Sequence, residues 1–166
     1  MIELLEKLAG QNGIQKTGFN LIYRIKKLES MEKPFVPNHL HLIVKGYVNT
    51  PPRKEEILND WFRRLVEKVR MVVVAGPTSV YVDEPGNEGL TGTVTLATSH
   101  AAIHVWDHDV PAMFQFDIYS CSEFTTEEVL EHLDEFGLIS CEYIRIDRNG
   151  ESMTVIEQKK IEYTVA

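Results

Sequence analysis

One segment of this chain has the residue spacing of an amphipathic helix, and most of what surrounds it has the spacing of β-strands. Residues 53–70 follow Pro51 and Pro52, and their apolar residues recur one and three positions apart. This spacing puts the apolar side chains on one face of a helix and the polar side chains on the other. We therefore predict a helix over residues 53–70 with an apolar face made of Ile57, Leu58, Trp61, Phe62, Leu65, Val66 and Val69.

The segments with strand spacing are short and rich in β-branched residues. They cover residues 39–48, 90–98, 101–106, 112–120, 138–147 and 153–163, and the runs 71–75 and 79–82 form two strands or one broken strand. Apolar and hydroxyl side chains alternate in the segment 90–98, which predicts a strand with one polar face formed by Thr91, Thr93 and Thr95.

A second, shorter helix is expected after residue 125. Thr125 and Glu128 have the spacing of a capping box, and Gly137 ends the helix. The order from residue 39 onward is β-α-β-β-β-α-β. Because the helices are segregated between groups of strands, we predict an α+β fold: a two-layer α/β sandwich with a mainly antiparallel sheet. The sequence has no Gly-rich phosphate loop that would favour a nucleotide-binding parallel sheet.

Charge and composition narrow the classes of function. Seventeen Lys and Arg against 25 Asp and Glu give a formal charge of −8, which argues against nucleic-acid binding because phosphate contacts need clustered cations. No apolar run approaches the roughly 20 residues of a membrane span, and the acidic start does not match a signal peptide. We expect a cytoplasmic protein. Pro34 and Pro37 mark a boundary between an N-terminal arm, residues 1–38, and one domain, residues 39–166.

The residues whose side chains could take part in catalysis or metal binding cluster between Thr91 and Cys121. His100, His104 and His108 are four residues apart, which on a helix would suit zinc. On a strand this spacing separates neighbouring histidines by roughly 13 Å, so we expect no metal site. Ser99, His104 and Asp117 offer the residue types of a hydrolytic triad, but no Gly-x-Ser-x-Gly turn surrounds Ser99.

A third interpretation of these residues comes from two short sequence motifs. Residues 99–106, Ser-His-Ala-Ala-Ile-His-Val-Trp, and residues 116–121, Phe-Asp-Ile-Tyr-Ser-Cys, resemble two segments of the short, bacterial-type S-adenosylmethionine decarboxylases. The resemblance covers residues 39–147, so residues 39–166 are expected to form a domain of this type. The second cysteine, Cys141, has no counterpart in these motifs, and we expect it to be structural.

The resemblance implies a proenzyme that cuts itself between Thr98 and Ser99. In this family the serine at the Ser99 position attacks the preceding carbonyl, and the resulting ester eliminates to leave a pyruvoyl group, the cofactor, at the new N-terminus. By position, His104 assists the elimination, Thr91 helps processing, and Cys121 protonates the substrate carbon after decarboxylation. A ketone suits this chemistry because no ordinary side chain accepts electrons as CO₂ leaves.

The same resemblance implies a function and a partner. The family decarboxylates S-adenosylmethionine to supply aminopropyl groups for spermidine and other polyamines, and its short members pair as homodimers that complete their active sites. Asp107 and Asp109 follow the motif where the family has Pro-Glu, so either one is a candidate ligand of the substrate ribose. Two alternatives are a decarboxylase of arginine or ornithine with the same fold, and a non-catalytic relative that binds a small molecule or a partner chain.

Overall fold

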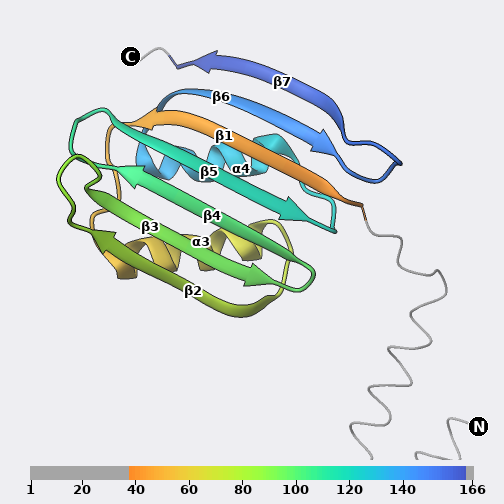
Figure 1. The fold of residues 1–166 in the computed structure, drawn as a ribbon, viewed down its shortest axis with the longest axis horizontal. Helices are drawn as coiled ribbons and strands as arrows, with labels where there is room; N and C mark the ends of the chain where they lie inside the picture. Colours follow the sequence, from red (N-terminus) through yellow and green to blue (C-terminus); the bar gives the residue numbers. More distant parts are fainter. Residues whose placement is uncertain (1–37, 164–166) are drawn as a thin grey trace, which may run out of the picture. The chain divides into compact units, whose positions relative to one another are not determined.

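Seven strands form one antiparallel sheet in the computed structural model, which describes residues 38–163. Most of the predicted arm lies outside the described residues. The strands follow the order β2-β3-β4-β5-β1-β6-β7 across the sheet (Figure 1). Their bounds are β1 Leu40–Val48, β2 Val73–Val82, β3 Gly89–Leu96, β4 Ser99–Trp106, β5 Ala112–Ser120, β6 Leu138–Asp147 and β7 Thr154–Glu162.

The helical elements cover one face of this sheet (Figure 1). They are α3, Glu55–Lys68, α4, Thr126–Leu133, and the short 3-10 helix η1, Asp134–Phe136. The predicted α+β class and two-layer sandwich are confirmed. All the predicted strand segments form, and the runs 71–75 and 79–82 join in β2, whose register with β3 is irregular. Four strands lie between the helices and two follow α4, one more in each place than the predicted order contained.

Side chains alternate between a core face and an open face along the strands. The core face packs under the helices and includes Leu42, Phe114 and Phe116 together with the predicted Trp61 and Phe62 of α3, all of them at most 2% exposed. On the opposite face of β1, Ile43 and Tyr47 are 42% and 40% exposed. The sheet therefore buries one face in the chain itself and leaves apolar side chains accessible on the other.

Local signals in the sequence set the ends of α4 and η1. Thr125 and Glu128 form the predicted capping box, in which each side chain accepts a hydrogen bond from the other's backbone N–H. Gly137 ends η1 with a φ of 67°, a conformation that glycine adopts without steric cost. No helix in the described part of the chain is long and apolar enough to span a membrane.

Glu128 also links α4 to the segment that follows α3, through an ion pair with Arg70. Its carboxylate accepts a hydrogen bond from the Arg70 guanidinium at 2.7 Å. This contact, with that of the Thr125 backbone, lowers the pKa of Glu128 to about 2. A carboxylate whose pKa is lower in the folded state than its unfolded value of about 4.3 stabilises the fold above that value. The contribution disappears as the pH falls toward 2.

We expect Glu128→Gln to lower the free energy of unfolding by about 0.5–1 kcal/mol at pH 7, because the amide retains the cap but loses the charge. The difference from the wild type should shrink as the pH falls from 5 toward 3, as measured by urea unfolding. Glu131→Gln is the matched control, since Glu131 is on the same helix and its side chain is 71% exposed. The same pH-dependent loss in both variants would contradict this role of Glu128.

Candidate active site

Ser99 lies at the turn between β3 and β4, directly after a residue with strained backbone. The two strands pair up to Leu96 and Ser99, so Ala97 and Thr98 are the turn residues. Thr98 has a φ of 65°, in the left-handed region that glycine or asparagine usually occupies in such turns. A β-branched residue there costs of order 1–3 kcal/mol. The peptide bond predicted to be cut therefore follows a strained residue.

Cys121 contacts both residues of this peptide bond. Its thiol donates a hydrogen bond to the carbonyl oxygen of Thr98 at 3.0 Å, and its backbone N–H donates one to Ser99 Oγ at 3.1 Å. Cys121 follows β5 directly, and the antiparallel pairing of β4 with β5 brings it beside the turn. The structure thus brings together the Ser99 hydroxyl, the Thr98 carbonyl that it is predicted to attack, and the buried Cys121 thiol.

Two residues that the sequence did not reveal, His39 and Tyr119, also contact the Cys121 thiol. His39 Nδ1 and Tyr119 Oη each lie 3.5 Å from Cys121 Sγ, and they lie 2.5 Å from each other. The backbone of His39 is held by Arg148 and Asn149, each through a hydrogen bond of 2.8 Å. His39 precedes β1, whose pairing with β5 brings the two segments together, so no local motif could have indicated this contact.

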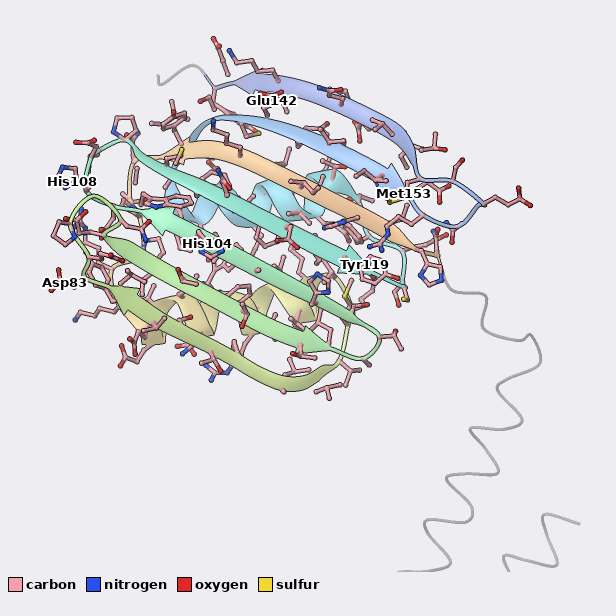
Figure 2. All side chains as sticks on the ribbon, viewed as in Figure 1. Asp83, His104, His108, Tyr119, Glu142 and Met153 are labelled. Carbon is pink, nitrogen blue, oxygen red and sulfur yellow. The ribbon has the colours of Figure 1, made fainter. Side chains whose placement is uncertain are left out.

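Tyr119 is enclosed by charged and aromatic groups at this end of the sheet (Figure 2). The hydrogen bond with Cys121 and burial raise the pKa of Tyr119, although the Arg148 guanidinium, 4.5 Å from the ring centroid, opposes the shift. The phenol therefore keeps its proton at neutral pH. Next to it, Asp117 Oδ2 lies 3.4 Å from His41 Nε2 and 3.6 Å from His100 Nε2.

His104 lies elsewhere, near the middle of the open face (Figure 2). Its Nδ1 lies 3.0 Å from Thr91 Oγ1 on the neighbouring strand, so the structure pairs two of the predicted site residues. Ser99 is five residues from His104 in the same strand, a separation of about 17 Å. An odd separation also directs the two side chains to opposite faces. Within one chain, His104 and Thr91 therefore do not reach Ser99.

A pocket of about 400 Å³ opens beyond His104, toward the far end of β4. It contains Asp109 but not Asp107, the other candidate ligand of a ribose. Asp107 is 2% exposed and its carboxylate contacts Arg53 at 3.3 Å and the Tyr81 hydroxyl at 2.9 Å. Asp109 is therefore the accessible one of the two. The pocket is lined by Tyr47, Gly86, Glu88, Trp106, His108, Asp109, Pro111 and Met113.

The two other residue groups considered from the sequence, the three histidines and the residues of a hydrolytic triad, do not come together within residues 38–163. His100 and His104 are four residues apart in β4, His108 lies in the following turn, and no group of three potential ligands there has the geometry of a metal site. Asp117 contacts His41 and His100 rather than His104 and Ser99, so Ser99, His104 and Asp117 do not form a triad. Cys141 is a buried free thiol, and burial raises its pKa to about 11.

The comparison with protein families gives one match, to S-adenosylmethionine decarboxylase, over residues 40–149. The match covers more than half of the chain and includes the strained turn, Cys121, His104 and the pocket. This chain belongs to the S-adenosylmethionine decarboxylase family. No curated protein matches it. The family as a whole consists of pyruvoyl-dependent decarboxylases, which supports an S-adenosylmethionine decarboxylase-like function for this chain.

Proposed function

We propose that this chain is a self-processing S-adenosylmethionine decarboxylase of the short, bacterial type, a cytoplasmic enzyme that supplies aminopropyl groups for polyamine synthesis. Residues 39–166 would form the decarboxylase domain and residues 1–38 an arm. The observation that best supports this proposal is the turn at Ser99. There a serine hydroxyl follows a strained residue whose carbonyl oxygen accepts a hydrogen bond from the Cys121 thiol.

Processing starts with attack of Ser99 Oγ on the carbonyl carbon of Thr98. The C–N bond between the two residues breaks as the C–O bond forms, and the backbone amine of Ser99 is released. The Cys121 thiol is placed to stabilise the negative charge that develops on the Thr98 oxygen, as preorganised donors do in acyl transfer. Relief of the Thr98 backbone strain favours the same direction. Elimination then removes Thr98 as a carboxylate. Water then replaces the nitrogen of residue 99, which leaves as ammonia, so the ketone oxygen comes from water.

The surroundings of Ser99 fit a pyruvoyl group formed there. The new N-terminus would lie beside the Cys121 thiol, whose present acceptor, the Thr98 carbonyl oxygen, belongs to the fragment 1–98. When present, the group supplies a carbonyl that accepts electrons as CO₂ leaves. Cys121 would then give its proton to the substrate carbon, because its thiol is a hydrogen-bond donor that lies beside this position.

His104 and Thr91 enter this scheme through a homodimer. Because about 17 Å of strand separates His104 from Ser99 in one chain, we propose that His104 of the partner subunit and the partner's Thr91 act at each Ser99. The exposed apolar side chains of Ile43 and Tyr47 on the open face support an interface on that face. The partner's His104 would reach Ser99 at the end of the sheet, because Ser99 is the first residue of β4 and lies at the β3–β4 turn. The pocket with Asp109 would hold the substrate ribose in the same composite site.

The test is release of labelled CO₂ from carboxyl-labelled S-adenosylmethionine by the purified full-length chain. Arginine and ornithine are the controls that represent the alternative substrates. Release from S-adenosylmethionine alone supports the proposal. Release of CO₂ from arginine or ornithine alone would show that the chain is a decarboxylase of that amino acid instead. An uncut chain without turnover would indicate a non-catalytic relative that binds a small molecule or a partner chain.

We expect Cys121→Ala to cut itself, more slowly than the wild type because it loses the thiol at the Thr98 carbonyl, and to decarboxylate about 10²–10⁴-fold more slowly, the usual effect of losing a general acid. Misplaced protonation would also convert the pyruvoyl group to alanine, so that fragment 99–166 becomes open to N-terminal sequencing. Cys141→Ala is the matched control, a buried cysteine remote from the turn, and should retain turnover. Full activity in Cys121→Ala would contradict the assignment.

A further inference from the structure

The Cys121 thiol needs a new proton after every turnover, and it has little access to water. It is 5% exposed and surrounded by Thr98, Ser99, His39 and Tyr119. If Cys121 gives a proton to the substrate carbon, as proposed above, the resulting thiolate must be protonated again before the next substrate reacts. The question is which neighbouring group supplies that proton.

His39 contacts Tyr119, and Tyr119 contacts the Cys121 thiol, so the three side chains form a chain of contacts. His39 Nδ1 lies 2.5 Å from Tyr119 Oη, and Tyr119 Oη lies 3.5 Å from Cys121 Sγ. The His39 and Tyr119 rings are nearly parallel, with 9° between their planes and 6.0 Å between their centroids. Two hydrogen bonds hold the His39 backbone, and Arg148 covers the Tyr119 ring. The set is therefore fixed before any substrate binds.

We propose that His39 and Tyr119 are positioning residues that return a proton to Cys121 after each turnover; this proposal rests on the proposed function. The Cys121 S–H bond breaks as the C–H bond forms on the substrate carbon. Tyr119 then gives its hydroxyl proton to Sγ and takes the Nδ1 proton of His39. The other ring nitrogen of His39, Nε2, takes a proton from water, so one proton passes from water to product.

The kinetic test compares the first turnover with later turnovers in the full-length wild type, His39→Ala and Tyr119→Phe. The first turnover needs no reprotonation of Cys121, so its rate should stay within about twofold of the wild type, while later turnovers should slow by about tenfold or more. Added imidazole should restore the later turnovers of His39→Ala and leave Tyr119→Phe unchanged. Equal slowing of first and later turnovers would indicate a merely structural role and overturn the proposal, as would wild-type kinetics in both variants.

A second readout does not depend on the pyruvoyl group. In the uncut Ser99→Ala chain, the short His39–Tyr119 contact should give a strongly downfield ring N–H resonance in the proton NMR spectrum. Adding His39→Ala or Tyr119→Phe should remove the resonance. Its absence from the Ser99→Ala chain would overturn the relay. If the wild type neither cuts itself nor releases CO₂, the proposed function fails instead, and the NMR result still decides whether the His39–Tyr119 contact exists.

Discussion

Ser99→Ala is expected to leave the chain intact and without decarboxylase activity, whereas the wild type should give fragments 1–98 and 99–166. The methyl group cannot attack the Thr98 carbonyl, so neither the ester nor the ketone forms, and turnover should fall to background. The strain at Thr98 and the Cys121 contact remain in this variant, but neither provides a nucleophilic oxygen. Denaturing mass spectrometry measures the cut, and N-terminal sequencing shows whether the second fragment is blocked.

Ser140→Ala is the matched control for this experiment. Ser140 is also a half-buried serine on a strand, but it lies on β6, on the other side of β1 from β4 and β5. This control should cut and turn over as the wild type does. A wild-type chain that stays intact after long incubation would contradict the processing scheme, and cleavage in Ser99→Ala would show that another residue is the nucleophile.

Co-expression of Ser99→Ala with His104→Ala chains is expected to restore activity that neither variant has alone. His104→Ala by itself should stall with ester or uncut chain, because the partner's His104 is missing from both sites. In a mixed dimer, the His104→Ala chain provides Ser99 and the Ser99→Ala chain provides His104, so one of the two sites is complete. With random pairing in a two-fold dimer, about a quarter of the wild-type activity should return.

Gel analysis with chains of different length shows which chain is cut. If His104 acts across the interface, only the His104→Ala chain should be cut in the mixed dimer. If His104 acts within its own chain, neither should be. Co-expression of Ser99→Ala with Cys121→Ala is the matched control, because both residues belong to one half of the site and their loss should not be complemented. Light scattering that gives a monomer at micromolar concentration would contradict the dimer itself.

Much of the fold was predictable because short-range patterns settled it. The apolar face of α3 gave a helix with Trp61 and Phe62 in the core, and the alternation in β3 placed its threonines on the face away from the helices. The capping box at Thr125 needed only residues three positions apart. The predicted strand segments were confirmed, but the predicted order contained one strand too few before α4 and one too few after it. Pairing with β3 decided that the runs 71–75 and 79–82 form one strand.

Part of the candidate site was also predictable from the sequence, and part was not. The sequence by itself determined which residue types occur at which spacing, and the resemblance of its motifs to the S-adenosylmethionine decarboxylases indicated Ser99, Cys121, His104 and Thr91. The alternation of side chains along a strand also predicts that Ser99 and His104 are apart, because residues five positions apart in β4 point to opposite faces. Had β4 been predicted to begin at Ser99, this separation would have followed.

Only the tertiary structure decided which of these residues are neighbours. The pairing of β4 with β5 places the Cys121 thiol on the Thr98 carbonyl, and the pairing of β5 with β1 adds His39 to the same group. Packing around the β4–β5 turn buries Asp107 against Arg53 and leaves Asp109 at the pocket. Strand pairing joins residues far apart in the sequence through backbone hydrogen bonds and shared burial, and local residue patterns do not encode which partners will meet.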